Sequence, residues 1–269
     1  MRPLNNYFWR KRSMKKMVFF DLDGTLCSGG SLQVEQEIIT AFNDLKKNDI
    51  LPIIATGRSH YEVKGLLDLL RVEHYILSNG CYVHSAGRTI QNMTFTIGEV
   101  EAILAIAKKY QLSAGYFNQR GYAITQFSEV VEEHVAHMGI SEVPVVADFY
   151  QSNPVNFMNL YLNAEMEEKI REELGAIADL VRFAPLAIDV LPKNVSKGTA
   201  IKSLLTSLRD SQIETYAFGD QNNDISMFQL VDFGVAMSHS TEQLKRQSSY
   251  IATSTNGVIE GLKYYGLIS

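Results

Sequence analysis

Cysteine is scarce in this sequence, which has only two in 269 residues, Cys27 and Cys81. Neither belongs to a CxxC motif or to a cluster with histidine. This scarcity argues against a disulfide framework and against a structural zinc site. Sparing use of cysteine fits a reducing compartment, so we expect a cytoplasmic location.

Long apolar runs are also missing. No segment approaches the roughly 18 apolar residues that a membrane-spanning helix needs. The basic opening segment "MRPLNNYFWRKRSMKKM" contains no acid, and the apolar run that follows ends already at Asp21, which does not fit a secretory signal. We expect residues 1–16 to form a disordered leader, with Met14 and Met17 as alternative starts of the chain.

An excess of positive charge is absent as well. The formal net charge is −5, and no basic stripe runs through the body of the chain. Nucleic acids and anionic membranes attract basic surfaces, so we expect neither as a partner. The 46% hydrophobic and 20% charged content is that of a globular protein and predicts no particular oligomeric state.

Short apolar runs alternate with amphipathic stretches in residues 17–82 and 189–269, which predicts an α/β fold with a parallel sheet. The predicted strands include "MVFF", "ILPIIA", "TYAFGD" and "FGVAM". Residues 83–188 differ, because helical stretches there alternate with strand pairs such as "SAGYFN" with "YAITQ" and "LVRF" with "LAIDV". We therefore predict an α+β module inserted into a parallel core.

Polar residues gather where predicted strands end or a predicted helix begins. They are Asp21, Asp23, Thr56, Gly57, Arg58, Lys197, Gly198, Asp220, Asn223 and Asp224. Each group alone has an ordinary structural explanation, such as an Asp-Gly turn, a Thr N-cap or an acidic first helical turn. Ligands of open parallel sheets bind beyond the carboxyl ends of the strands, however, so the joint placement predicts one site.

The residue types match phosphoryl transfer. Oxygen ligands from Asp21, Asp220 and a backbone carbonyl suit Mg²⁺, and the cation would offset the repulsion between Asp21 and Asp23. An ionised Asp21 could attack phosphorus and form an aspartyl-phosphate, while Asp23 could serve first as acid and then as base.

Donors for the phosphate group come from the same positions. The Thr56 hydroxyl and the Lys197 ammonium suit phosphate oxygens, and the backbone amides of the turn after Asp21 add further donors. Arg58 fits a pocket role and a surface ion pair equally well. Asn79 fits a hairpin turn first and a substrate contact second.

Four motifs in order along the chain carry a family resemblance: "DLDGT", "TGR", "SKG" and "GDQNND". They resemble the motifs of the haloacid dehalogenase-like superfamily. "LSNGCYV" and "IDVLPKNVSKGTAI" resemble its Cof-type phosphatases, which carry an α/β cap between the second and third motifs. The resemblance implies a Rossmann-like, doubly wound core with residues 83–188 as cap. It also implies Mg²⁺ dependence and hydrolysis of small phosphate monoesters such as sugar phosphates or phosphorylated cofactors.

The resemblance also assigns roles to individual residues, and it adds Asn223 and Asp224 as support for phosphate and metal. The resulting predictions are Asp21 and Asp23 as catalytic residues; Leu22, Thr56, Gly57, Lys197 and Asn223 on phosphate; Asp21, Asp23, Asp220 and Asp224 on metal; and Arg58 and Asn79 in the substrate pocket. Gln221 replaces the frequent Gly of the fourth motif, and Cys27 follows the first. Both departures bear on substrate preference rather than on the nucleophile or the metal.

Two rival functions share these residues. A phosphomutase would form the same aspartyl-phosphate and pass the phosphoryl group to a second hydroxyl, so only its products would differ. A phosphate-ligand binder without catalysis would need no nucleophile such as Asp21. The sequence implies a small phosphorylated metabolite as partner but does not name it.

Overall fold

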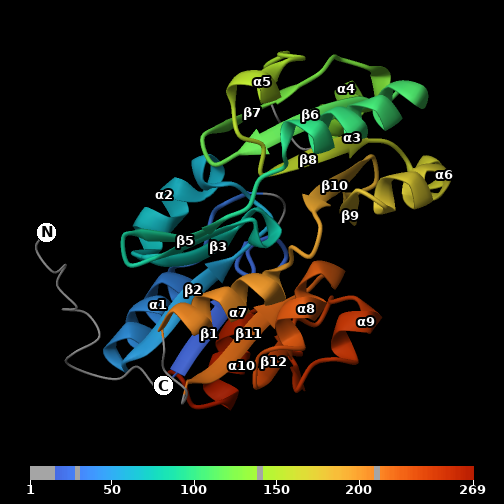
Figure 1. Ribbon diagram of the computed structural model, residues 1–269. Helices are drawn as coiled ribbons and strands as arrows, with labels where there is room; N and C mark the ends of the chain where they lie inside the picture. The colour runs from blue at the N-terminus through green and yellow to red at the C-terminus, as the bar shows by residue number, and fades with distance from the viewer. Residues whose placement is uncertain (1–15, 28–30, 138–141, 209–212) are drawn as a thin grey trace, which may run out of the picture.

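The computed structural model describes residues 16–27, 31–137, 142–208 and 213–269 (Figure 1). The prediction of a disordered leader falls on residues 1–15, which lie outside the described residues. Lys16, the last residue assigned to that leader, instead begins β1 (Lys16–Phe20) and pairs with Glu214 and Ile50.

The larger of two sheets has the strand order β13-β12-β11-β1-β2-β3-β4-β5. Its further strands are β2 (Ile50–Ala55), β3 (His74–Leu77), β4 (Tyr82–Ser85), β5 (Arg88–Asn92), β11 (Glu214–Gly219), β12 (Phe233–Ala236) and β13 (Tyr250–Ile251). Neighbouring strands from β13 to β3 run parallel, and β4 and β5 extend the sheet antiparallel. The predicted α/β class with a parallel core is confirmed.

Helices cover both faces of this sheet, which explains the uninterrupted apolar run of β1. Val18 and Phe20 pack into one core, and Met17 and Phe19 pack into another on the opposite face. The first core is covered by α1 (Gln36–Lys47), α2 (His60–Leu70) and α10 (Gly257–Tyr264), and the second by α7 (Lys197–Leu208), α8 (Ile225–Phe228) and α9 (Glu242–Lys245). None of the helices in the described segments combines the length and apolarity needed to span a membrane.

The strand order reverses beside β1. From β1 the chain proceeds outward through β2 and β3, whereas its later strands β11, β12 and β13 build the sheet in the other direction. Asp21 follows β1 and Asp220 follows β11, the two strands that flank this reversal. A crevice opens at such a point beyond the strand ends, and the candidate carboxylates lie there.

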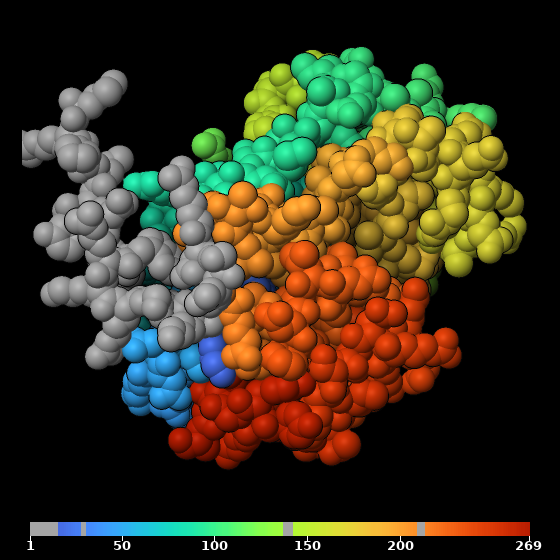
Figure 2. Space-filling model, turned by 60° about the horizontal axis from the view of Figure 1, so that its bottom comes forward, coloured from blue at the N-terminus to red at the C-terminus, as the bar shows by residue number. Residues whose placement is uncertain are grey.

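The inserted module has an antiparallel sheet with the order β7-β6-β8-β10-β9. It consists of α3 (Ile97–Lys109), β6 (Ser113–Asn118), β7 (Gly121–Ile124), α4 (Glu129–His137), α5 (Phe149–Ser152), β8 (Phe157–Tyr161), α6 (Ala164–Gly175), β9 (Ala178–Ala184) and β10 (Ala187–Pro192). The predicted strand pairs correspond to β6 with β7 and β9 with β10. In the space-filling view the module, green to yellow, stacks on the body that contains the larger sheet (Figure 2).

The module begins and ends later than the predicted boundaries at 83 and 188. β4 and β5 belong to the larger sheet, and β10 stays in the smaller sheet as far as Pro192. The Ser78–Gly80 turn (η1) folds β4 back onto β3, as its Asn-Gly sequence suggested. A hairpin signal is local, so it does not show which sheet the returning strand joins.

Close packing of α7 against α8 depends on Gly198, and this gives a stability prediction. A Cβ at Gly198 would lie 2.2 Å from the backbone oxygen of Ser226, so Gly198→Ala should destabilise the fold by about 1–3 kcal/mol in urea unfolding. Gly65→Ala, on the exposed side of α2 with nothing within 4 Å, should instead stabilise it by roughly 0.5–1 kcal/mol. Equal urea midpoints for Gly198→Ala and wild type would contradict this prediction, because they would show that the Ser226 backbone moves away from the added methyl group without loss of stability.

Candidate active site

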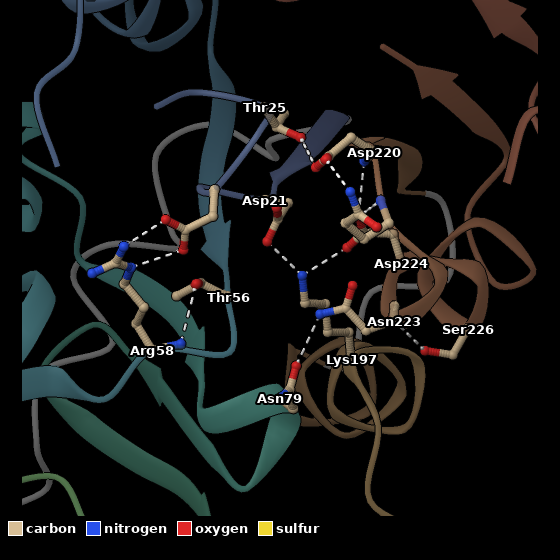
Figure 3. Close-up of polar contacts among 12 residues, drawn as sticks. Asp21, Thr25, Thr56, Arg58, Asn79, Lys197, Asp220, Asn223, Asp224 and Ser226 are labelled. Atoms are coloured by element: carbon tan, nitrogen blue, oxygen red, sulfur yellow. Dashed lines mark hydrogen bonds and ion pairs between the residues drawn. The ribbon is translucent and has the colours of Figure 1, made fainter. Parts of the chain in front are cut away.

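Lys197 joins two carboxylates at the base of the site. Its Nζ donates to Asp21 Oδ1 over 2.5 Å and to Asp224 Oδ1 over 2.6 Å. All three residues are buried, and Lys197 reaches both carboxylates from the first turn of α7 (Figure 3). The sequence assigned Lys197 to phosphate binding; the structure shows that its ammonium group also holds Asp21 and Asp224 together.

The loop after β11 orients its own carboxylates. Asp224 Oδ2 accepts the backbone N–H groups of Asp220 and Gln221 at 2.9 and 3.1 Å. Thr25 Oγ1 donates to Asp220 Oδ1 at 3.1 Å, and Gln221 Nε2 donates to Asp220 Oδ2 at 3.0 Å. Gly24, with φ of +85°, permits this approach, because a Cβ there would lie 2.2 Å from Asp220 Oδ2. Gln221, the departure from the usual motif, therefore contacts the predicted metal ligand Asp220 as well as lining the cavity, so, contrary to the prediction from the sequence, it does not bear on substrate preference alone.

Three carboxylates converge at this point. One oxygen from each of Asp21, Asp220 and Asp224 lies within 4.8 Å of the others. Burial raises the pKa of Asp21 against the opposing effect of Lys197, and burial together with the Asp224 charge raises the pKa of Asp220. One ammonium group does not balance three carboxylates, so this set of oxygen donors fits a hard divalent cation.

The Asp23 carboxylate is held apart from this group. Arg58 donates to both of its oxygens, from Nε over 2.8 Å and from Nη2 over 2.6 Å. The Asp23 side chain stays 44% exposed, and Glu62 Oε1 lies 3.9 Å from Arg58 Nη1. Asp23 does not belong to the cluster of Asp21, Asp220 and Asp224, and its contact with metal stays a prediction. The guanidinium fork fixes the orientation of the carboxylate instead.

The predicted phosphate-binding residues come from the ends of different strands. Leu22 is fully buried after β1, and its carbonyl accepts backbone N–H groups of the following turn. Thr56 Oγ1, after β2, accepts the backbone N–H of Arg58 at 3.2 Å. Asn223, after β11, donates from Nδ2 to Asn79 Oδ1 at 3.1 Å (Figure 3). The fold brings these separate segments to one edge of the sheet.

A cavity of about 370 Å³ lies where the two sheets face each other. The predicted residues that line it are Asp21, Asp23, Thr56, Gly57, Arg58, Asn79 and Asn223. Lys197, Asp220 and Asp224 are not among its lining residues, because they are buried beneath it, where Lys197 bonds to Asp21.

Sequence reasoning missed the part of the wall that the module supplies. The module side chains that were not predicted are Phe117, Phe157, Asn159, Val181, Arg182, Phe183 and Asp189; outside the module, Glu62, Gln221 and Asn222 also line the cavity without having been predicted. One signal was present: Asp189 is a lone carboxylate in the apolar run "LAIDVLP". A charge in the interior of a predicted buried strand calls for a partner or a function.

Comparison with known proteins gives matches along almost the whole chain. YkrA of Bacillus subtilis (strain 168) is 27% identical over 259 residues, covering 94% of this chain and 98% of that protein. The 5-amino-6-(5-phospho-D-ribitylamino)uracil phosphatase YwtE of the same organism is 26% identical and covers 90% of this chain and 95% of its own.

A solved structure also matches almost the whole chain. The sugar phosphatase BT4131, of haloacid dehalogenase subclass IIB, superposes with a TM-score of 0.82 at 25% identity and covers 94% of this chain and 100% of its own. The model of the haloacid dehalogenase-like hydrolases matches residues 18–262, which span both halves of the parallel core and the inserted module. The resemblance inferred from the four sequence motifs is thus confirmed: this chain belongs to the haloacid dehalogenase-like hydrolase family.

Proposed function

We propose that this protein hydrolyses a small phosphate monoester with the help of Mg²⁺, through a phosphorylated Asp21. The observation that carries the proposal is the position of Asp21, which lines the cavity, is held by Lys197 and lies beside the carboxylates of Asp220 and Asp224. The names of YwtE and BT4131 support a phosphorylated small molecule as substrate. The cavity volume of about 370 Å³ suits a ligand of that size.

Asp21 serves as the nucleophile. One of its carboxylate oxygens bonds to phosphorus while the bond between phosphorus and the ester oxygen breaks. The hydrogen bond from Lys197 favours the ionised form of Asp21, which burial alone would disfavour. The same contact fixes which oxygen faces the cavity, because Oδ1 is occupied by the ammonium group.

Asp23 transfers the protons. In its protonated form it gives a proton to the departing ester oxygen, and the resulting carboxylate then takes a proton from the water that attacks the phosphoenzyme. That attack releases inorganic phosphate and restores Asp21. Arg58 holds both Asp23 oxygens and so keeps the carboxyl group at a defined place on the cavity wall.

Mg²⁺ fits the cluster formed by Asp21, Asp220 and Asp224, which supplies the carboxylate oxygens that this ion prefers. When bound, the ion supplies positive charge beside the phosphoryl oxygens. Thr56 and Asn223 would bind those oxygens together with the backbone of Leu22 and Gly57. Lys197 would add its charge from beneath.

Asp21 and Asp23 should not be interchangeable. Asp21→Asn should lower turnover of every ester by at least about 10³-fold and leave no phosphoenzyme. Asp23→Asn should still be phosphorylated by an aryl phosphate, whose leaving group needs little protonation, and then stall. Rapid mixing should show a burst of phenol, and intact-mass measurement should show the trapped adduct. With an alkyl or sugar phosphate both steps should slow by about 10²–10⁴-fold.

The same experiment separates the alternatives. Equal losses of Asp23→Asn on both esters, without a trapped adduct, would count against Asp23 as acid and base. Wild-type enzyme that isomerises a sugar phosphate without releasing phosphate would be a phosphomutase. A protein that releases phosphate from no ester in a broad screen would contradict the proposed function.

Removal of the metal gives an independent test. Excess chelator should abolish turnover and added Mg²⁺ should restore it, with Ca²⁺ a poor substitute because it favours looser and higher coordination. Asp220→Ala should weaken Mg²⁺ binding in calorimetry by at least about tenfold. Asp68→Ala serves as control: it removes an exposed carboxylate of α2, and the variant should bind Mg²⁺ like wild type. Normal Mg²⁺ affinity of Asp220→Ala would remove Asp220 from the metal site.

A further inference from the structure

The module presents a lone carboxylate to the cavity. Ile188 and Val190 of β10 pack into the core of the module, whereas Asp189 between them belongs to the opposite face and lines the cavity. Phe117 and Phe157 line the same wall, so Asp189 is a charged group set among aromatic side chains and is only 6% exposed.

Two amides from different parts of the fold hold Asp189. Asn159 is its register partner on β8 and donates from Nδ2 to Oδ1 at 2.6 Å. Asn79 donates from Nδ2 to Oδ2 at 2.7 Å and itself accepts from Asn223. A carboxylate has about four acceptor positions, so two of them remain for a ligand in the cavity.

The two amides leave part of the acceptor capacity of Asp189 unused. Asn159 takes one carboxylate oxygen and Asn79 the other, and each oxygen keeps a further acceptor position. Burial raises the pKa of Asp189 to about 7, because the ionised carboxylate is unfavourable away from water. None of the described residues forms an ion pair with Asp189 that would compensate its charge. Because Asp189 lines the cavity, its open acceptor positions point to a ligand that donates hydrogen bonds.

Two cationic side chains, Arg58 and Arg182, are among the lining residues that the structure describes. Arg58 binds Asp23. Arg182 donates from Nε to Glu167 at 2.6 Å and from Nη1 to backbone carbonyls, whereas its Nη2 has no hydrogen-bond partner among the described residues. Neither of the two forms an ion pair with Asp189, so the acceptor positions of that carboxylate stay open to the leaving group.

We propose that Asp189, held by Asn159 and Asn79, accepts hydrogen bonds from hydroxyl groups of the leaving group and determines specificity for it. The preferred substrates are then phosphate esters whose leaving group carries hydroxyl groups. This inference rests on the proposed phosphatase function and extends it to the part of the substrate that departs.

The test compares kcat/KM for two esters of matched chain length, an alditol phosphate and an alkyl phosphate without hydroxyls. Wild type should prefer the alditol phosphate by at least about tenfold. Asp189→Asn should lose about 10–100-fold in kcat/KM on the alditol phosphate and change by less than about threefold on the alkyl phosphate.

Asp179→Asn is the matched control, because Asp179 lies in the same sheet, outside the cavity lining, and pairs with exposed Lys193. It should leave kcat/KM for both esters unchanged. Equal losses of Asp189→Asn on both esters would overturn the proposal in favour of a structural role.

The wild-type preferences need no variant, so the proposal stays testable if Asp189→Asn fails to fold. Wild type that cleaves 4-nitrophenyl phosphate but treats the alditol and alkyl esters alike would overturn the specificity proposal alone. Wild type that cleaves no ester, 4-nitrophenyl phosphate included, would overturn the proposed function and this inference with it.

Discussion

The buried ammonium group of Lys197 between Asp21 and Asp224 is the interaction on which the site depends. Burial alone would lower the pKa of Lys197, but the two carboxylates outweigh burial and raise it. Each partner compensates a charge that would otherwise be left unpaired away from water, a situation that typically destabilises a protein by about 3–5 kcal/mol. The three side chains are therefore mutually required.

This ionic bridge also explains how the chain can carry an insertion. Asp21 ends the first strand, Lys197 begins the helix after the module, and Asp224 belongs to the loop after β11. The bridge ties the segments before and after the module at one point. The module can then contribute a wall to the cavity while the carboxylates stay fixed by contacts within the larger sheet and its helices.

The two sheets supply different kinds of side chain to the site. The parallel sheet supplies the charged groups at its strand ends, whereas the module supplies an apolar wall with Asp189 and Asn159. Asn79 connects them, because it accepts from Asn223 and donates to Asp189. Its φ of +52° in the tight turn after β3 directs one amide toward both parts, and asparagine tolerates this left-handed conformation better than most residues.

The sequence by itself determined the parallel core, the inserted module and the residues at the strand ends. These follow from local patterns: apolar runs of strand length, helical periodicity, and polar residues at the ends of buried strands. It did not determine that β4 and β5 join the larger sheet, that Lys197 contacts two carboxylates, or that Arg58 holds Asp23. It also did not show that Asp189 and Asn159 belong to the cavity. Only the tertiary structure decided these points, because each depends on which distant segments meet, and periodicity along one strand does not encode its neighbour on the next.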